Sequence, residues 1–162
     1  MQETLEAEPE VVIDPNTLSE DGTVALSGYS FSKDGQYLAY QISEGGSDWR
    51  KARILNLETG EELEEELNWI KFSGLSWAGN GFYYSRYPEP EEGEKLSGSN
   101  TFQKVYYHEL GTPQEEDELV FADRAHPRRG FVATTTEDEQ YLALSVWETT
   151  SGNGFYIKEL GG

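Results

Sequence analysis

The sequence predicts an all-β protein made of about three four-stranded β-propeller blades. Three observations carry this prediction: the apolar runs are short and rich in β-branched and aromatic residues, turn signals separate them, and one pattern occurs three times. Ten Tyr, seven Phe and four Trp supply large apolar side chains, although hydrophobic residues make up only 36% of the chain. We therefore expect a folded core rather than disorder.

The repeated pattern consists of a short strand, a tight turn and an aromatic-rich strand. It is found in "GYSFSKDGQYLAYQIS" from Gly28, "GLSWAGNGFYYSRY" from Gly74 and "GFVATTTEDEQYLALSV" from Gly130. Each copy leads through a Gly-bearing loop to a further strand that ends in Leu. The starts lie 46 and 56 residues apart, the second interval being lengthened by an insertion over 88–100. A period of about 40–50 residues with four strands is typical of a propeller blade.

The expected strands follow one another along the whole chain. They cover residues 10–14, 24–32, 37–43, 49–57, 67–73, 74–78, 81–87, 102–110, 117–123, 130–136, 141–149 and 154–160. Turns containing Gly, Pro or Asp separate them, and only residues 16–20 favour a helical turn. A β-sandwich uses strands of similar spacing, but the internal repeat favours the propeller.

We expect two regions, an acidic tail and a partial propeller. The tail covers residues 1–9, the propeller residues 10–162, and the repeats lie near 24–73, 74–123 and 130–160. The last repeat has only three strands, so "EVVID" at 10–14 is expected to complete it. Propellers close with four to eight blades. The chain is therefore expected to be an open arc, or half of a six-bladed homodimeric ring in which residues 10–14 of one copy complete the last blade of the other.

The net charge of −19 excludes several classes of partner. No basic patch could neutralise the phosphates of a nucleic acid, and an anionic membrane surface should repel the chain. No apolar run approaches the roughly 20 residues of a membrane span, and the acidic N-terminus does not resemble a signal peptide. The absence of Cys excludes disulfide and thiolate chemistry. The acidic runs are expected in solvated loops and outer strands.

Four stretches come near the pattern of a chemical site without matching it. Ser76 in "GLSWA" comes near a G-x-S-x-G nucleophile elbow, but a strand rather than a helix follows it. His108 is expected on a strand, facing solvent or bonded locally, and His126 lies in a Pro-containing loop with no second ligand nearby. "DPNTLSEDG" from Asp14 lacks the ligand spacing of an EF-hand and is expected to be a turn. No cofactor, metal or catalytic residue is therefore expected.

Three aromatic residues lie near the junction of the first two repeats. These are Trp69, Phe72 and Trp77. In a complete ring, aromatic side chains near the axis could bind a peptide or a proline ring. In an arc, packing between blades is the expected role.

Six stretches carry the motifs of a known family. They are "IDPNTLSEDGTVALSGYSFSKDGQYLAY" (13–40), "SDW" (47–49), "IKFSGLSW" (70–77), "YYSRYP" (83–88), "NTFQKVYYHELGT" (100–112) and "DELVF" (117–121). Together they resemble the propeller domain of prolyl oligopeptidase, a serine peptidase. The resemblance covers nearly the whole chain from about residue 8.

The resemblance implies a role in substrate access. In that family a seven-bladed propeller caps an α/β-hydrolase domain and admits only short peptides, which are cleaved after proline. This chain resembles about three blades, so the catalytic Ser, Asp and His are not expected in it. We expect a non-catalytic fragment of a substrate-gating propeller, natural, excised or engineered as a scaffold. The alternatives are a self-assembling interaction module and an accessory part that needs a separate hydrolase domain.

The resemblance also bears on two positions and on the compartment. It implies that Phe72, in "KFS", lines the pocket for the substrate proline. Ser27 stands where the family commonly has an Arg that holds the propeller to neighbouring structure, which is a departure from the family. The family implies a cytoplasmic or periplasmic location.

Overall fold

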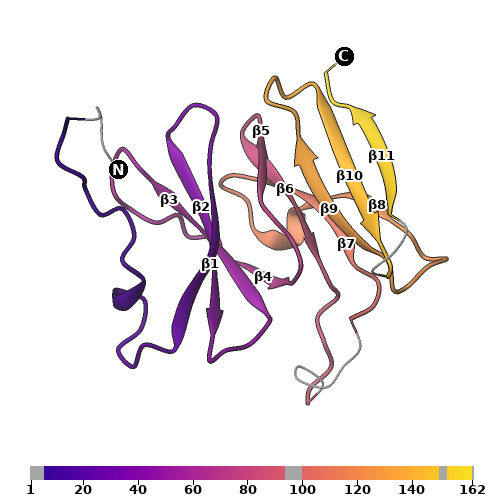
Figure 1. Cartoon of the computed structure of the whole chain (residues 1–162), viewed down its shortest axis with the longest axis horizontal. Coiled ribbons are helices and arrows are strands. Elements are labelled where there is room, and N and C mark those ends of the chain that lie inside the picture. The colour runs from indigo at the N-terminus through magenta and orange to yellow at the C-terminus, as the bar shows by residue number, and fades with distance from the viewer. Residues whose placement is uncertain (1–5, 94–99, 150–152, 162) are drawn as a thin grey trace.

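The computed structural model describes residues 6–93, 100–149 and 153–161, and these residues form three blades side by side (Figure 1). The first blade contains β1 (Val24–Phe31), β2 (Tyr37–Glu44), β3 (Arg50–Asn56) and β4 (Leu67–Ile70). The second contains β5 (Ser76–Ala78), β6 (Gly81–Arg86), β7 (Lys104–Glu109) and β8 (Glu118–Ala122). The third contains β9 (Gly130–Thr135), β10 (Tyr141–Trp147) and β11 (Gly154–Glu159). The predicted all-β architecture of about three blades is confirmed.

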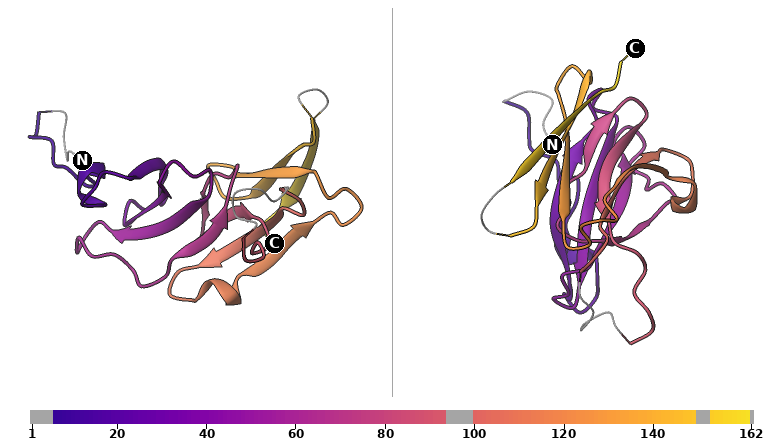
Figure 2. Two further views of the ribbon diagram at one scale, coloured as in Figure 1. Left: turned by 90° about the horizontal axis from the view of Figure 1, so that it is seen from below. Right: turned by 90° about the vertical axis from the view of Figure 1, so that its right-hand side faces the viewer.

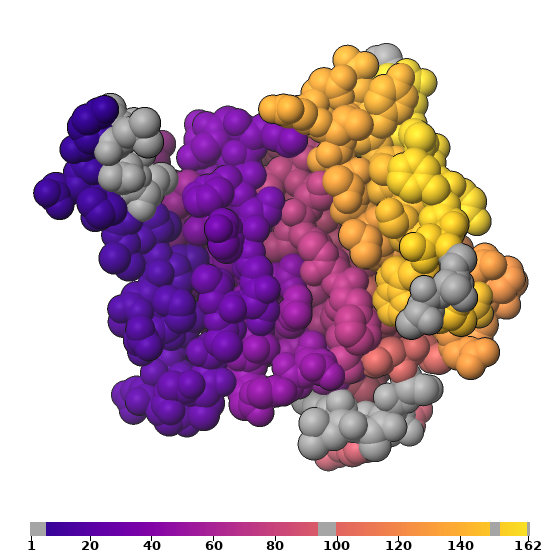
Figure 3. Space-filling view, viewed as in Figure 1, coloured from indigo at the N-terminus to yellow at the C-terminus, as the bar shows by residue number. Residues whose placement is uncertain are grey.

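Within each blade, consecutive strands are antiparallel neighbours. A single pairing of Ile70 with Arg86 links β4 to β6, and so joins the first two blades into one continuous sheet. The third blade is a separate sheet in the order β11-β10-β9. Figure 3 shows the blades in chain order across one face of the molecule, from indigo to yellow.

Two tight turns, in the first and third blades, share one hydrogen-bond pattern. Ser32 Oγ donates to Asp34 Oδ1 (2.6 Å) and Thr136 Oγ1 donates to Asp138 Oδ1 (2.5 Å). Each carboxylate also accepts a bond from the backbone N–H two residues further on (3.0 and 3.1 Å). These bonds hold the pKa of Asp34 and of Asp138 below the usual value, since they stabilise the ionised form. The sequence repeat therefore extends to the side-chain bonds of its turns.

The middle strands of the first two blades have side chains buried on both faces. In β2 the five consecutive residues from Leu38 to Ile42 are all buried, because a neighbouring element covers each face of the strand. Trp77 fills the space between the first two blades. Its side chain is 3% exposed, its ring centroid lies 5.1 Å from that of Phe82, and its Nε1 donates to the carbonyl of Ser30 (2.9 Å). The expected packing role of Trp77 is confirmed.

The N-terminal segment differs from its prediction. Residues 10–14 form no strand and do not complete the last blade of their own chain. Val12 and Ile13 pack instead against buried side chains of the first blade, including Leu38 and Tyr40. Figure 1 and the views in Figure 2 place this segment beside the first blade, at the opposite end of the array from β11. The apolar side chains of the first blade lie next to this segment, whereas the free edge of β11 lies at the other end of the array.

The expected helical turn over 16–20 begins slightly earlier, as a short 3-10 helix at Pro15–Thr17. Its N-cap is Asp14, whose Oδ1 accepts a bond from the backbone N–H of Asn16 (2.9 Å). A second 3-10 turn lies at Gln114–Glu116. No helix in the described ranges is long and apolar enough to cross a membrane.

Burial of tyrosines predicts loss of stability at alkaline pH. Burial raises the pKa of Tyr87 to about 12, against 10.0 for an ordinary Tyr. Since the folded-state pKa is raised, the stabilising contribution is complete below pH 10 and is lost as the pH rises toward 12. Tyr87→Phe should therefore reduce the fall in unfolding free energy over this range by at most about 1.4 kcal/mol per pH unit.

Urea unfolding of both proteins at half-unit pH steps from 9 to 12 measures this difference. At pH 7 the two proteins should unfold at nearly the same urea concentration. Identical slopes above pH 10 would show that the Tyr87 hydroxyl is not shielded from solvent in the fold.

Candidate functional site

The segment between β4 and β5 presents an exposed aromatic side chain at one end of the blades. Phe72 is 47% exposed, and its backbone φ of 55° lies in the left-handed region that bulky residues rarely adopt. Such a conformation costs on the order of 1–3 kcal/mol and persists only where surrounding contacts enforce it. Here the buried amide of Gln41 donates to the carbonyl of Ser73 (2.9 Å), and that of Gln103 donates to the carbonyl of Lys71 (2.9 Å). The exposed position of Phe72 is thus fixed from both sides.

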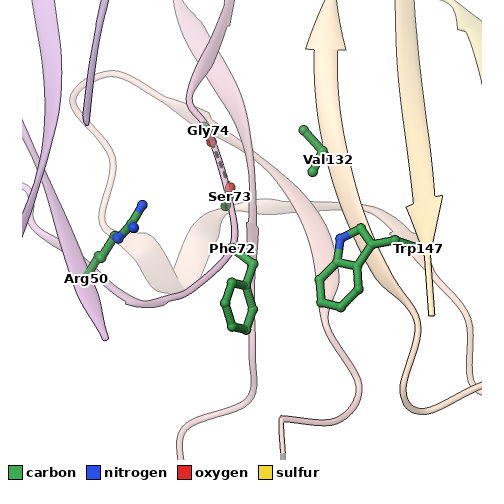
Figure 4. A pocket seen from close by; sticks show the side chains of 6 residues that line it. All are labelled: Arg50, Phe72, Ser73, Gly74, Val132 and Trp147. Carbon is green, nitrogen blue, oxygen red and sulfur yellow. Dashed lines mark hydrogen bonds between the residues drawn. The ribbon is translucent and has the colours of Figure 1, made fainter. Parts of the chain in front are cut away.

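Phe72 faces an aromatic partner from the third blade. The Trp147 ring, at the end of β10, meets the Phe72 ring edge-to-face, with centroids 5.6 Å apart and planes at 89°. The two rings border an open cavity of about 590 Å³. Figure 4 shows its lining, which comprises Arg50, Phe72, Ser73, Gly74, Val132 and Trp147. The first blade, the third blade and the connection between the first two blades contribute to this set, which we call the aromatic cleft.

The position of Trp147 depends on a glycine in the adjacent strand. Gly130 pairs with Trp147 across β9 and β10. A Cβ atom at Gly130 would lie 2.1 Å from two carbons of the indole ring, well inside van der Waals contact. The missing side chain therefore lets the indole lie directly over the start of β9.

Arg50 forms the opposite wall of the aromatic cleft. It is the first residue of β3 and is partly buried. Its Nη1 lies 3.5 Å from Gln41 Oε1, and the other end of the same amide bonds the carbonyl of Ser73. Gln41 thus connects the guanidinium to the segment that carries Phe72.

A second cation lies among these aromatic rings. The Lys71 ammonium is 4.5 Å from the centroid of the Trp49 ring and 5.9 Å from that of Phe72. Trp69, which also has a left-handed backbone (φ 62°), meets Trp49 edge-to-face with centroids 5.8 Å apart. Trp69 thus belongs to the neighbourhood of the cleft but not to its lining.

Ser76 has a structural role. Its Oγ lies 2.9 Å from Thr135 Oγ1 and accepts a bond from the Thr135 backbone N–H (2.8 Å). These bonds join β5 to β9, and β6 follows β5 after a tight turn, so the residue is not placed as a nucleophile. Ser27 bonds across the first blade, with its Oγ 3.2 Å from Ser43 Oγ.

His108 does not face solvent, contrary to the sequence-based expectation. Its side chain is fully buried, with Nδ1 2.7 Å from Asp117 Oδ1 and Nε2 3.5 Å from Glu65 Oε1. The Tyr84 hydroxyl donates to the other oxygen of Asp117, and burial together with this bond raises the pKa of Tyr84. Alternation along the strand predicted an outward-facing side chain, but β7 lies inside a blade and is covered on both faces.

His126 bonds within its own loop. Its Nδ1 lies 2.9 Å from Asp123 Oδ2, which also accepts a bond from Arg129 (3.0 Å). Burial raises the pKa of Asp123, but the bonds from His126 and Arg129 outweigh that effect and lower it overall. Within the residues that the structure describes, no group of three or more His, Asp or Glu side chains is arranged to hold a metal ion.

Comparison with known sequences identifies the family. A profile described as "Prolyl oligopeptidase, N-terminal beta-propeller domain" matches residues 1–162. The chain belongs to the prolyl oligopeptidase family. Its residues correspond to the family's N-terminal propeller domain, as the sequence motifs indicated.

Individual relatives agree with this assignment. The chain is 51% identical over 152 residues to a prolyl endopeptidase of Elizabethkingia meningoseptica, covering 93% of this chain and 22% of the relative. It is 39% identical to prolyl oligopeptidase A of Amanita bisporigera, covering 94% of this chain and 22% of that relative. The chain therefore spans about a fifth of the length of the curated relatives it matches.

Solved structures show the same fold. A structure from an analysis of two prolyl endopeptidases superposes with a TM-score of 0.84 at 37% identity, covering 94% of this chain and 21% of the other. Prolyl oligopeptidase B of Galerina marginata was solved with a 35mer hydrolysis and macrocyclization substrate. It superposes with a TM-score of 0.84 at 33% identity, covering 91% of this chain and 22% of the other.

The sequence singled out Phe72 through the family resemblance, but not the residues that surround it in the fold. Trp147 lies 75 residues further along the chain, and no local pattern brings the two rings together. Arg50 and Gly130 likewise act through neighbours in space. The one available signal for Trp147 was a large aromatic residue at the very end of an apolar strand.

The close approach of Gly130 to Trp147 predicts that no larger residue fits at position 130 without moving the indole. Gly130→Ala should displace the indole from the aromatic cleft. The new methyl group would lie 2.1 Å from two ring carbons and cannot rotate away from them, so the ring itself must move. The indole N–H resonance of Trp147 in an NMR spectrum should shift strongly.

Gly74→Ala is the matched control. Gly74 also lines the cleft, but a Cβ there meets no atom within 4 Å, so the indole resonance should stay near its original position. An unshifted indole in Gly130→Ala would contradict the packing described for Trp147.

Proposed function

We propose that these residues supply the non-catalytic, substrate-gating part of a proline-specific serine peptidase, and that the aromatic cleft receives the proline ring of the peptide. Membership of the prolyl oligopeptidase family supports the first part of this proposal. The names of the relatives, prolyl endopeptidase and prolyl oligopeptidase, indicate the substrate class.

The exposed, enforced position of Phe72 carries the second part. Phe72 and Trp147 meet at nearly a right angle and form an apolar corner open to solvent. A proline ring is compact and apolar and has no N–H to satisfy, so it can pack on both aromatic rings without desolvating a donor. Keeping Phe72 exposed at a left-handed φ costs free energy, which is typical of residues that act on a ligand.

The gating role requires a hydrolase domain next to the end of the blades that bears the cleft. A peptide bound between the two would contact the cleft on one side and the catalytic groups on the other. Residues of the cleft would then act by selecting and orienting the peptide, and not by taking part in bond cleavage.

Peptide binding tests this proposal. Acetyl-Gly-Pro-amide, titrated into ¹⁵N-labelled chain, should perturb the NMR signals of Phe72, Gly74 and the Trp147 indole more than acetyl-Gly-Ala-amide does. Phe72→Ala should weaken binding of the proline peptide by roughly fivefold or more, since an aromatic contact is worth about 1 kcal/mol beyond its buried area.

Phe102→Ala provides the matched control. Phe102 is also an exposed Phe with a left-handed backbone (φ 63°), but it does not line the aromatic cleft. Equal responses to the proline and alanine peptides, or equal loss of binding in both variants, would contradict the proposed role.

A second candidate function, self-association by strand addition, is supported by the outer edge of β11. All six residues of β11 are exposed, including Phe155 (61%) and Ile157 (64%), and β10 pairs with only one side of the strand. An apolar, unpaired strand edge readily accepts another strand. Pairing with residues 10–14 of a second copy would require Val12 and Ile13 to leave the first blade, whereas pairing of β11 with β11 would not.

Light scattering over a concentration series tests this candidate. It predicts a dimer at high concentration that Ile157→Lys converts to monomer, because a charge on the edge opposes strand addition. A wild-type chain that remains monomeric throughout would exclude it.

A further inference from the structure

An asparagine or aspartate followed by a glycine is a chemically reactive pair, and the chain contains four such pairs. In them the backbone nitrogen of the glycine can approach the preceding side-chain carbonyl carbon, because a glycine has no Cβ to hinder the approach. The pairs are Asp21-Gly22, Asp34-Gly35, Asn80-Gly81 and Asn153-Gly154. Which of them reacts depends on the leaving group of the side chain and on how the fold holds the backbone.

The two aspartates are poorly reactive because each carboxylate is ionised and bonded. Asp34 Oδ1 accepts bonds from Ser32 Oγ (2.6 Å) and from the Gln36 backbone N–H (3.0 Å). Asp21 Oδ1 accepts bonds from Thr23 Oγ1 (2.7 Å) and from the Thr23 backbone N–H (3.2 Å). These bonds hold the pKa of both carboxyl groups below the usual value. An ionised carboxylate resists attack by a nucleophile.

Asn80 is held by the backbone pairing of a tight turn. It lies between β5 and β6, and its carbonyl accepts a bond from the Leu110 backbone N–H (3.0 Å). Gly81 pairs with Ala78 on one side and with Glu109 on the other. The turn must therefore open before the Gly81 nitrogen can reach the Asn80 side chain.

Asn153 has different surroundings. It is exposed and directly precedes β11, whose first residue is Gly154. Gly154 is exposed too, and β11 pairs with β10 on one side only within the described part of the chain. Among the residues that the structure describes, no hydrogen bond holds the Asn153 side chain. The Gly154 nitrogen can therefore reach Asn153 Cγ without breaking up a turn between two paired strands.

We propose that Asn153 is a site of spontaneous deamidation, a modification that lies outside the proposed function. The Gly154 nitrogen attacks Asn153 Cγ and forms a bond to it. The bond from Cγ to the side-chain nitrogen breaks, and ammonia leaves with the proton that the backbone nitrogen loses. Water then opens the five-membered succinimide at one of its two carbonyl carbons, giving aspartate or isoaspartate. The net reaction consumes one water and releases one ammonia.

The modification changes the entry to β11 in two ways. Both products add a negative charge to a chain that already carries −19. Isoaspartate also inserts a methylene group into the main chain directly before Gly154. The first pairs of the strand, Gly154 with Val146 and Phe155 with Ser145, follow at once. We therefore expect isoaspartate to loosen these pairs and to leave the far end of β11 unchanged.

Peptide mapping by mass spectrometry tests the inference on the folded chain. In warm, neutral buffer Asn153 should deamidate at least about tenfold faster than Asn80, since a paired turn reacts only in its rare open state. In urea the two positions should react at similar rates, because both have the sequence Asn-Gly. Equal rates in the folded chain would overturn the inference. So would an Asn153 that stays intact when folded for as long as the unfolded chain takes to react at both positions.

Asn153→Gln should abolish the reaction at this position, because the corresponding ring would have six members and forms far more slowly. Gly154→Ala should slow it by hindering the attack. A Cβ there would lie 3.3 Å from Val146 Cβ, so β11 can accept it with a small shift. A Gly154→Ala chain that deamidates at the wild-type rate would contradict attack by the Gly154 nitrogen.

Hydrogen exchange of the purified isoaspartate form measures the consequence for β11. The amides of Gly154 and Phe155 should exchange about tenfold faster than in the unmodified chain, while those of Lys158 and Glu159 should not change. Asn153→Asp is the matched control, because it adds the charge without the methylene group and should exchange like the unmodified chain. Unchanged exchange in the isoaspartate form would overturn the proposed loosening of the strand.

Discussion

The fold depends on covering the middle strands of the first two blades on both of their faces. β2 shows this need most clearly, because both the odd- and even-numbered side chains from Leu38 to Ile42 are buried. A lone antiparallel blade would leave one of these faces in water, at about 25 cal/mol for each Å² of apolar surface. Neighbouring blades therefore stabilise one another, and large aromatic side chains such as Trp77 fill the space between them. The aromatic cleft lies where this stacking reaches the end of the strands.

Packing of two-sided strands also buries polar groups, and these are satisfied between segments far apart in the sequence. Gln103 accepts a bond from the Phe131 backbone N–H (2.6 Å) while its amide nitrogen donates to the Lys71 carbonyl. Ser85 Oγ donates to the Phe131 carbonyl (2.6 Å). Since an unpaired buried polar group costs about 1–3 kcal/mol, these bonds fix how the second and third blades meet. They thereby also fix the distance between Phe72 and Trp147.

Much of the architecture could be predicted from the sequence, since turns and strands leave local patterns. The three repeats, the short strands and the turn before β6 were readable because each depends on neighbouring residues. The prediction of a strand at 10–14 was wrong. Val12 and Ile13 favour burial, and they are buried by packing against the first blade without forming a strand. Solvent exposure of His108 was predicted wrongly. Alternation along a strand assumes one buried and one exposed face, whereas His108 on β7 is fully buried. The pairing of Phe72 with Trp147 depends on a contact across blades, and the position of Arg50 depends on contacts with neighbouring strands of its own blade; no local pattern contains either.

The central claim is that Phe72 and Trp147 together hold a proline ring. Intermolecular nuclear Overhauser effects measure this contact directly, in a sample of ¹³C-labelled chain with an unlabelled proline peptide. We expect cross-peaks from the proline ring protons to the aromatic protons of both Phe72 and Trp147. Cross-peaks confined to residues outside the aromatic cleft, such as Phe155 and Ile157 on β11, would contradict it.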